Sequence, residues 1–212
     1  MSELDMEVVD GLTLSEKHRE LLRPGEAVED EHGNSHRLPR FFFSVPSWKK
    51  AYETRLAPHF KLAELMTVDC READLLLNEF PHYVPCAVTL IARYLEDLRR
   101  DADAVVLVGA NGGYRSPVHQ RNEPKSPHCW ATAADIYRVG GTYLDDEKSI
   151  AKYADMAQSL GPQVFARPYT KGDDHLHIDL GFITVTPRNC SEGLAAASPD
   201  VQKHVRPKTS PQ

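Results

Sequence analysis

The chain has 212 residues, of which 41% are hydrophobic and 26% charged, and its formal net charge is −6 at pH 7. This composition is typical of a globular protein with room for one domain and an additional segment, or for two small domains. The acidic balance excludes a general nucleic-acid-binding protein, which carries a basic surface, and disfavours electrostatic attachment to anionic lipid. We therefore expect a monomer with neither nucleic acid nor membrane as a partner.

The N-terminal part of the chain is polar and rich in charge, and prolines and glycines interrupt any long periodicity over its first 40 residues. These residues predict a loosely structured arm with one short helix at 14–22. Three consecutive aromatic residues, Phe41–Phe43, then precede a helical stretch at 47–56. We expect the aromatic side chains to hold the segment against the domain surface, and assign residues 1–58 to an N-terminal arm that packs on the domain.

From residue 60 the hydrophobic pattern becomes sharper. Apolar residues at spacings of three and four over 84–100 predict an amphipathic helix, whose final arginines suit the C-terminal end of a helix. The other predicted elements are a short helix at 60–66, strands at 104–109, 133–139, 163–166 and 175–180, and a helix at 145–160.

Helices and strands in this order do not alternate regularly. Such an order predicts an α+β fold with a small, mostly antiparallel sheet flanked by helices. We assign residues 59–192 to this domain. The remaining segment, 193–212, is rich in Ala, Ser, Pro and Lys, and we expect it to be a disordered tail.

The first 20 residues lack the apolar run of a Sec-type signal peptide, and no stretch of about 18 apolar residues occurs in the chain. We therefore expect the protein to reside in the cytoplasm. A trimmed N-terminus, lysis or a dedicated secretion system would allow another location.

The four cysteines are scattered and show no Cys-x-x-Cys spacing; they are Cys70, Cys86, Cys129 and Cys190. This pattern argues against a disulfide framework and against a cysteine-based structural zinc site. We expect all four to be small, mostly buried side chains.

Three short segments carry side chains typical of a metal site. They are Gly113–Pro117 (Gly-Tyr-Arg-Ser-Pro), Ser126–His128 followed by Asp135, and Asp174–His177 (Asp-His-Leu-His). A His-x-His pair on a strand places both imidazoles on the same face, because side chains alternate along a strand. Taken singly, each pattern is common on protein surfaces, so only their combination indicates a site.

Two histidines and one aspartate on strand-like segments, with a fourth position left for water, make up a catalytic rather than a structural zinc site. Zinc held in this way lowers the pKa of water and polarises a carbonyl group. A peptidase also needs a carboxylate that passes a proton from the water to the leaving amine, and Asp173 and Asp174 are both placed for this. Arg115 supplies a fixed positive charge for a developing oxyanion or a substrate carboxylate.

The three motifs in this order, Gly-Tyr-Arg-Ser-Pro, Ser-x-His-x6-Asp and Asp-His-x-His, resemble those of the zinc D-Ala-D-Ala carboxypeptidase group. That group belongs to the hedgehog/DD-peptidase fold, with the LAS-type peptidoglycan peptidases. The resemblance covers residues 60–182, a little over half of the chain, and rests on the order and spacing of the motifs.

The resemblance implies one zinc ion per chain, bound by His128, Asp135 and His177. The family often has glycine three residues after the first zinc histidine, where this chain has Ala131. The additional methyl group can narrow the site or alter its approach to the sheet. Asp179 is either a hydrogen-bond partner of a metal-binding histidine or a solvated residue.

The resemblance also implies Asp174 as the general acid/base, with His175 beside the transition state without ligating the metal. Arg115 would bind the substrate carbonyl or carboxylate, and Ser126 would help to hold the substrate. Strict strand alternation, however, places Asp173 rather than Asp174 on the face of the histidines. A bend at the preceding glycine resolves this, so we keep Asp174 and hold Asp173 in reserve.

The implied activity is hydrolysis of a peptide bond next to a D-amino acid in peptidoglycan stem peptides. The sequence leaves carboxypeptidase and endopeptidase open. An enzyme expected in the cytoplasm would reach the cell wall only after release or secretion.

One alternative is a cytoplasmic dipeptidase acting on D-Ala-D-Ala or another small peptide. Related dipeptidases have Glu three residues before the last zinc histidine, where this chain has Asp174. Another alternative is a binding module that keeps zinc but has lost turnover, and the presence of Asp174 and Arg115 argues against it.

Overall fold

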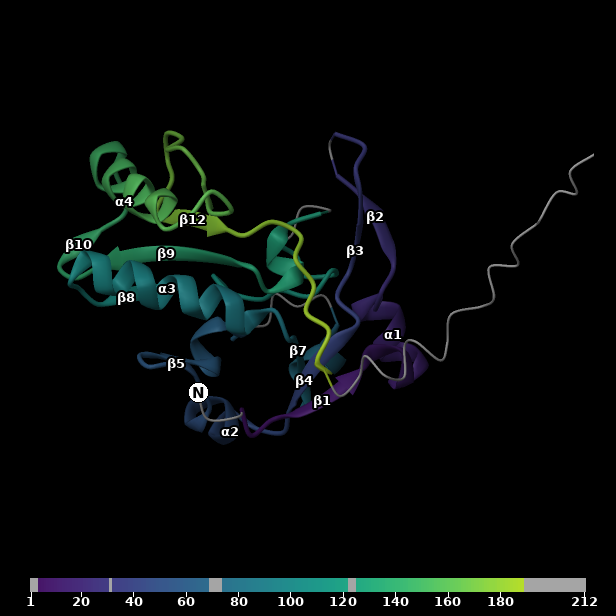
Figure 1. The fold of residues 1–212 in the computed structure, drawn as a ribbon. Coiled ribbons are helices and arrows are strands. Elements are labelled where there is room, and N and C mark those ends of the chain that lie inside the picture. Colours follow the sequence, from purple (N-terminus) through teal and green to yellow (C-terminus); the bar gives the residue numbers. More distant parts are fainter. Residues whose placement is uncertain (1–3, 31, 69–73, 122–124, 189–212) are drawn as a thin grey trace, which may run out of the picture.

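The computed structural model describes residues 4–30, 32–68, 74–121 and 125–188 (Figure 1). They form an α+β structure of small antiparallel sheets and a few helices, as the order of the elements predicts. The tail expected at 193–212 lies outside the described residues, as do Cys70 and Cys190, whereas Cys86 and Cys129 are buried as expected.

A five-stranded antiparallel sheet forms the C-terminal half of the described chain. Its main path runs β10-β9-β12-β11, and β8 also pairs with β9. The strands are β8 (Val106–Val108), β9 (Ala133–Val139), β10 (Thr142–Tyr143), β11 (Phe165–Ala166) and β12 (Leu176–Asp179). The four strands predicted in this region are thus confirmed, at shorter lengths for all except β9.

A second antiparallel sheet joins distant parts of the N-terminal half, in the order β1-β4-β7. It consists of β1 (Glu7–Asp10), β4 (Phe41–Val45) and β7 (His82–Pro85). The aromatic run Phe41–Phe43 is fully inside β4, and all three rings are buried. Consecutive buried aromatics mean that both faces of this strand are covered.

The loose structure expected over the first 40 residues is therefore not what the structure shows for residues 4–30 and 32–40, nor is the segment up to residue 58 an arm outside the domain. These residues contribute two strands of a three-stranded sheet whose third strand, β7, lies on the other side of the expected boundary. The boundary itself, at 58/59, falls inside the hairpin of β5 (Arg55–Ala57) and β6 (Phe60–Lys61). The polar sequence of this segment did not predict the pairing. A strand that is buried only by distant partners shows no regular alternation of apolar and polar residues of its own.

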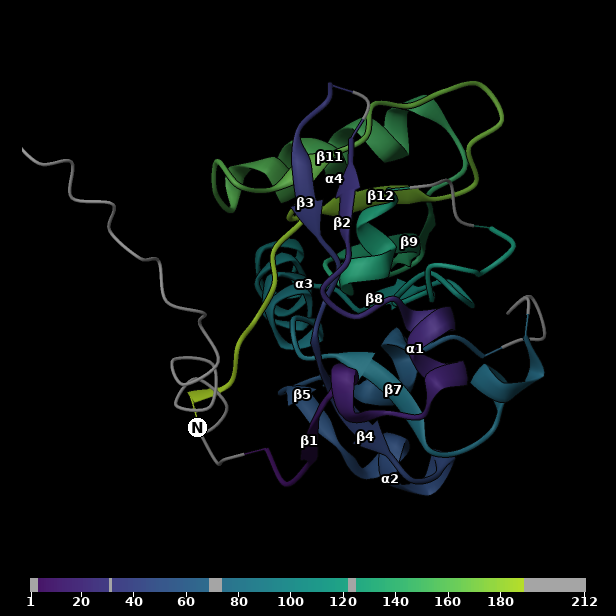
Figure 2. The ribbon, with the colours of Figure 1, turned by 90° about the vertical axis from the view of Figure 1, so that its right-hand side faces the viewer.

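A separate hairpin, β2 (Ala27–Glu29) and β3 (Ser35–Arg37), rises from the N-terminal half alongside the C-terminal sheet (Figures 1 and 2). A hydrogen bond from Trp130 holds the hairpin in place, since Nε1 of Trp130 donates to the carbonyl oxygen of Arg37 at 2.8 Å. Phe182 lies between, with its ring centroid 4.0 Å from that of His36 and 4.9 Å from that of Trp130. The hairpin is thus attached to the segment that carries His128.

The helices are α1 (Glu16–Leu22), α2 (Trp48–Glu53), α3 (Val88–Ala102) and α4 (Glu147–Ser159). The helix expected at 84–100 begins only at Val88, because Val84 and Pro85 belong to β7. A residue before proline is disfavoured in the helical region, which suits this boundary. The short helix expected at 60–66 is β6 followed by a 3-10 turn, η2 (Leu62–Leu65).

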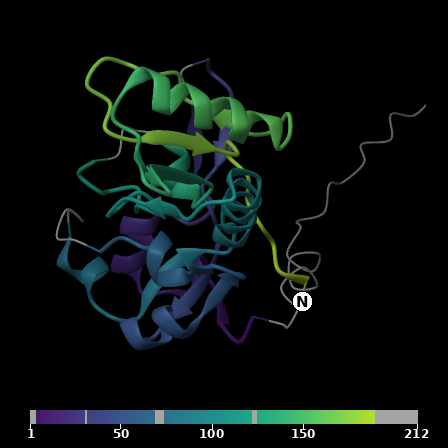
Figure 3. The ribbon, with the colours of Figure 1, turned by 90° about the vertical axis from the view of Figure 1, so that its left-hand side faces the viewer.

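The long helices cover the C-terminal sheet: α3 packs against β8 and β9, and α4 against β11 and β12 (Figure 3). In Figure 3 the N-terminal strands and α2 lie on one side of α3, and α4 with β12 on the other. Within the described parts of the chain, no helix combines the length and apolar character needed to cross a membrane.

Candidate metal centre and cleft

Two of the expected ligands lie directly opposite each other in the C-terminal sheet. Asp135 on β9 is the antiparallel partner of His177 on β12. Opposed residues in such a pair project from the same face with Cβ atoms about 5 Å apart. Strand pairing therefore brings together two side chains that are distant in the sequence.

The third expected ligand, His128, lies in a 3-10 turn, η4 (Pro127–Trp130). Ser126 caps this turn, since its Oγ accepts the backbone N–H of His128 at 3.4 Å. Ala131 ends the turn with φ 56°, in the left-handed region that favours glycine. The departure from the family pattern at Ala131 thus falls on a position where the backbone would prefer glycine, and its buried side chain joins the core.

The donor atoms converge on one point. His128 Nε2 lies 3.3 Å from Asp135 Oδ1, and His177 Nδ1 lies 2.9 Å from the same oxygen. One donor atom from each of the three residues lies within 4.8 Å of the others. Tetrahedral zinc with bonds of about 2.1 Å separates its ligand atoms by about 3.4 Å, so spacings of this order suit the ion.

The second ring nitrogen of His128 and of His177 has a hydrogen-bond partner that fixes the orientation of the imidazole. His128 Nδ1 lies 2.7 Å from the carbonyl oxygen of Gly113, and His177 Nε2 lies 3.0 Å from Asp179 Oδ2. Each outer nitrogen can therefore donate a proton, which leaves the lone pair of the inner nitrogen facing the common point. Asp179 is buried and bonded to His177, rather than solvated.

Burial and charge set the protonation of the centre. Burial lowers the pKa of His128 below its usual value. Burial also acts to lower the pKa of His177, but hydrogen bonds to Asp135 and Asp179 outweigh it and raise that pKa to about 9. For Asp135, burial acts to raise the pKa, but His128 and His177 hold it well below its usual range. Without a metal, the centre therefore keeps a proton on His177 that a cation can replace.

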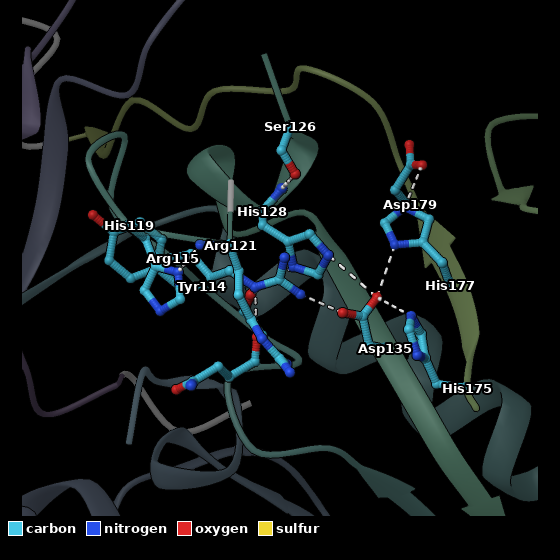
Figure 4. Close-up of polar contacts among 12 residues, drawn as sticks. Tyr114, Arg115, His119, Arg121, Ser126, His128, Asp135, His175, His177 and Asp179 are labelled. Carbon is cyan, nitrogen blue, oxygen red and sulfur yellow. Dashed lines mark hydrogen bonds and ion pairs between the residues drawn. The ribbon is translucent and has the colours of Figure 1, made fainter. Parts of the chain in front are cut away.

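Arg115 lies against this centre and is buried. One terminal nitrogen of its guanidinium donates to Asp135 Oδ2, and its Nε donates to the carbonyl oxygen of Asn111 at 2.6 Å (Figure 4). Burial lowers the pKa of Arg115, and the charge of Asp135 opposes this. The guanidinium thus holds the orientation of Asp135 and also lines the cleft in front of it.

Asp173 and Asp174, in the segment before β12, have different surroundings. Asp174 is exposed, lines the cleft and accepts a hydrogen bond from His175 Nδ1 at 2.7 Å. Asp173 accepts hydrogen bonds from Arg167 Nη2 at 2.9 Å and from the backbone N–H of Thr170 at 2.7 Å. Strict alternation does not apply to these aspartates, because β12 begins only at Leu176.

His175 completes the arrangement around Asp135. Its Nε2 lies 3.6 Å from Asp135 Oδ1 (Figure 4). It is not one of the converging donors in the described residues. The hydrogen bond from His175 is the first cause that lowers the pKa of Asp174, so this carboxyl is ionised at neutral pH.

The centre opens into a cleft of about 1040 Å³. All seven expected site residues line it: Arg115, Ser126, His128, Asp135, Asp174, His175 and His177. The sequence did not predict the other residues that line the cleft. They include Asp30 and His32 from the β2–β3 hairpin, Phe165 and Arg167 near β11, and Arg121. No motif marks these residues, because distant packing alone brings them to the cleft.

Comparisons of this chain with family models, with curated proteins and with solved structures find no match.

Proposed function

We propose that this protein is a zinc-dependent peptidase that hydrolyses a peptide bond next to a D-amino acid in peptidoglycan stem peptides. The proposal includes membership of the zinc D-Ala-D-Ala carboxypeptidase group and its hedgehog/DD-peptidase fold. The observation that carries it is the convergence of His128, Asp135 and His177 on one point in the lining of a cleft.

The chemistry of the donors supports zinc in particular. Two imidazoles and one carboxylate with a position open to the cleft are the ligand set of catalytic zinc. The outer hydrogen bonds from His128 to Gly113 and from His177 to Asp179 are of the kind that orients zinc-binding histidines. Zinc, when bound, supplies a Lewis acid that activates water and polarises the scissile carbonyl.

The remaining residues can perform the proton transfers and hold the substrate. Asp174, ionised and open to the cleft, takes the proton of the attacking water and delivers it to the nitrogen of the leaving amine. His175 positions that carboxylate through their hydrogen bond. Arg115 stabilises negative charge that develops on the carbonyl oxygen, at a site where burial strengthens the interaction.

The size of the cleft favours a peptide over a very small molecule. Its volume of about 1040 Å³ lies at the upper end of the range for small-molecule pockets, about 300–1000 Å³. Asp30 and His32, between β2 and β3, add to its lining outside the three converging residues. A stem peptide therefore suits the space better than a free dipeptide.

The deciding experiment is mass spectrometry of purified muropeptides after incubation with the zinc-loaded protein. We expect the loss of one D-amino acid or the cleavage of one cross-link, and the mass of the product identifies the bond. Zinc-loaded Asp174→Asn protein serves as the matched control and should leave the muropeptides intact. Unchanged muropeptides with the zinc-loaded wild type would refute the proposed activity and favour a non-catalytic binding module.

A further inference from the structure

A second arginine, Arg121, faces the cleft from the same loop as Arg115. The backbone N–H of Arg121 donates to Nδ1 of His119 at 3.0 Å, and His119 is buried. The loop is therefore anchored at this position, although the side chain of Arg121 is exposed. An anchored backbone with an exposed side chain suits contact with a ligand.

The guanidinium of Arg121 differs from the other two that line the cleft. Arg115 donates to Asp135 and to Asn111, and Arg167 is paired with Asp173 at 2.9 Å. Arg121 forms no hydrogen bond or ion pair through its side chain with any residue that the structure describes. Its donors are therefore available to a ligand, whereas those of the other two are partly committed.

The position of Arg121 places its charge near the reacting groups. The pKa of Asp174 is lowered first by the hydrogen bond from His175 and additionally by the positive charge of Arg121. The pKa of Arg115 is lowered first by burial, and the charge of Arg121 adds to this. An anion held by Arg121 would consequently lie in the cleft that the proposed acid/base, Asp174, also lines.

We propose that Arg121 binds the free carboxylate of the substrate's C-terminal residue, so that the protein acts as a carboxypeptidase rather than an endopeptidase. This inference rests on the proposed function. The planar guanidinium matches a carboxylate through two parallel hydrogen bonds. In an endopeptidase substrate a neutral amide would stand at this place and would leave the charge of Arg121 uncompensated.

The test measures binding rather than turnover. Zinc-loaded Asp174→Asn protein is titrated calorimetrically with N-acetyl-D-Ala-D-Ala and with its C-terminal amide, which differ only in the carboxylate. We expect the acid to bind at least about tenfold more tightly, the range of a charge-assisted hydrogen bond. Adding Arg121→Gln to the Asp174→Asn protein should reduce the ratio of the affinities for acid and amide to about one, without weakening binding of the amide. Arg121→Lys should keep part of the preference for the acid.

Two further substitutions control for charge alone. Lys148→Gln removes an exposed cation of α4 outside the cleft and should keep the full preference. Lys125→Gln removes another cleft-lining cation and should keep most of it. Unchanged zinc content and melting temperature would show that each variant is folded.

Three results would overturn the role of Arg121. They are equal binding of acid and amide, failure to bind either peptide, and a preference that survives Arg121→Gln. The muropeptide experiment is scored independently. Cleavage by the wild type without a preference for the acid would refute the inference about Arg121 and leave the peptidase intact. A preference for the acid without cleavage would leave Arg121 as a carboxylate-binding residue. It would refute the peptidase activity and, with it, the assignment as a carboxypeptidase.

Discussion

The three converging residues each make one contact toward the common point and another that holds the side chain in place. The inner donor atoms of His128 and His177 both lie near Asp135 Oδ1. Their outer nitrogens are held by Gly113 and Asp179. Because these supporting contacts lie within the protein, the three donor atoms are held close together by the protein alone.

At the scale of single residues, we expect one zinc per chain in the wild type and loss of the zinc in His128→Ala. The substitution removes one of three donors and leaves too few for a stable site. Elemental analysis of purified protein measures this directly. His175→Ala is the matched control, since His175 lies beside Asp135 without being a converging donor, and it should retain the metal. Full zinc occupancy in His128→Ala would contradict the ligand assignment.

The two neighbouring aspartates provide a second prediction at this scale. Asp174→Asn should retain zinc but lower kcat by about 10²–10⁴-fold, because it removes a proton carrier and no ligand. Asp173→Asn should keep most of the activity and lose about 1 kcal/mol of stability, because the Asp173 carboxylate accepts hydrogen bonds from Arg167 and Thr170 and contacts none of the converging donors. Kinetics on a stem peptide and thermal unfolding separate the two effects. An inactive Asp173→Asn with an active Asp174→Asn would reverse the assignment.

At the scale of elements, the close approach of the 109–113 segment to β9 supports the candidate metal centre. The backbone N–H of Asp135 donates to the carbonyl oxygen of Gly112 at 2.8 Å, and that of Gly109 donates to the carbonyl oxygen of Asp135 at 2.9 Å. A Cβ atom on Gly112 would stand 2.8 Å from the carbonyl oxygen of Asp135, which real Cβ atoms do not approach. Only glycine allows the segment to lie this close to the ligand-bearing strand.

Gly112→Ala should therefore destabilise the protein by about 1–3 kcal/mol, as forced repacking does. It should also weaken zinc binding about tenfold, because the strand that carries Asp135 must shift. Denaturant unfolding and competition with a zinc chelator measure the two quantities. Gly141→Ala, beyond the far end of β9, is the matched control, since an added Cβ there meets no atom within 4 Å. Equal effects of the two substitutions would show that the close approach is unimportant.

At the scale of the whole molecule, stability and zinc binding should both depend on pH through His177. Its pKa in the folded protein, about 9, lies above the usual value of 6.5. The resulting stabilisation of the metal-free protein is fully present below about pH 6.5 and is lost as the pH rises through about 9. The shift corresponds to about 3 kcal/mol at most.

We thus expect the melting temperature of the metal-depleted protein to fall between about pH 6.5 and pH 9, and zinc affinity to rise over the same range as the competing proton is lost. Calorimetry in chelator and in zinc at several pH values measures both. His177→Gln should flatten the pH dependence of the metal-depleted protein. A dependence that survives this substitution would place the titrating group elsewhere.

The sequence by itself determined the α+β class, the long helices and the segments that supply the expected ligands. These features depend on local patterns: apolar spacing along a helix, β-branched runs in strands, and the short Asp-His-x-His segment at the start of a strand. The spacing of Ser126, His128 and Asp135 and the order of the three motifs also lie in the primary structure. Each could be identified without knowledge of any distant contact.

Only the tertiary structure decided which residues meet. The pairing of Asp135 with His177 follows from the β9–β12 register, and the different partners of Asp173 and Asp174 follow from a turn before β12. The N-terminal segment looked like an arm because its strands β1 and β4 are completed by β7, far along the chain. Cleft walls such as Arg121 and the β2–β3 hairpin carry no local signal, because their place depends on packing between segments that are remote in the sequence.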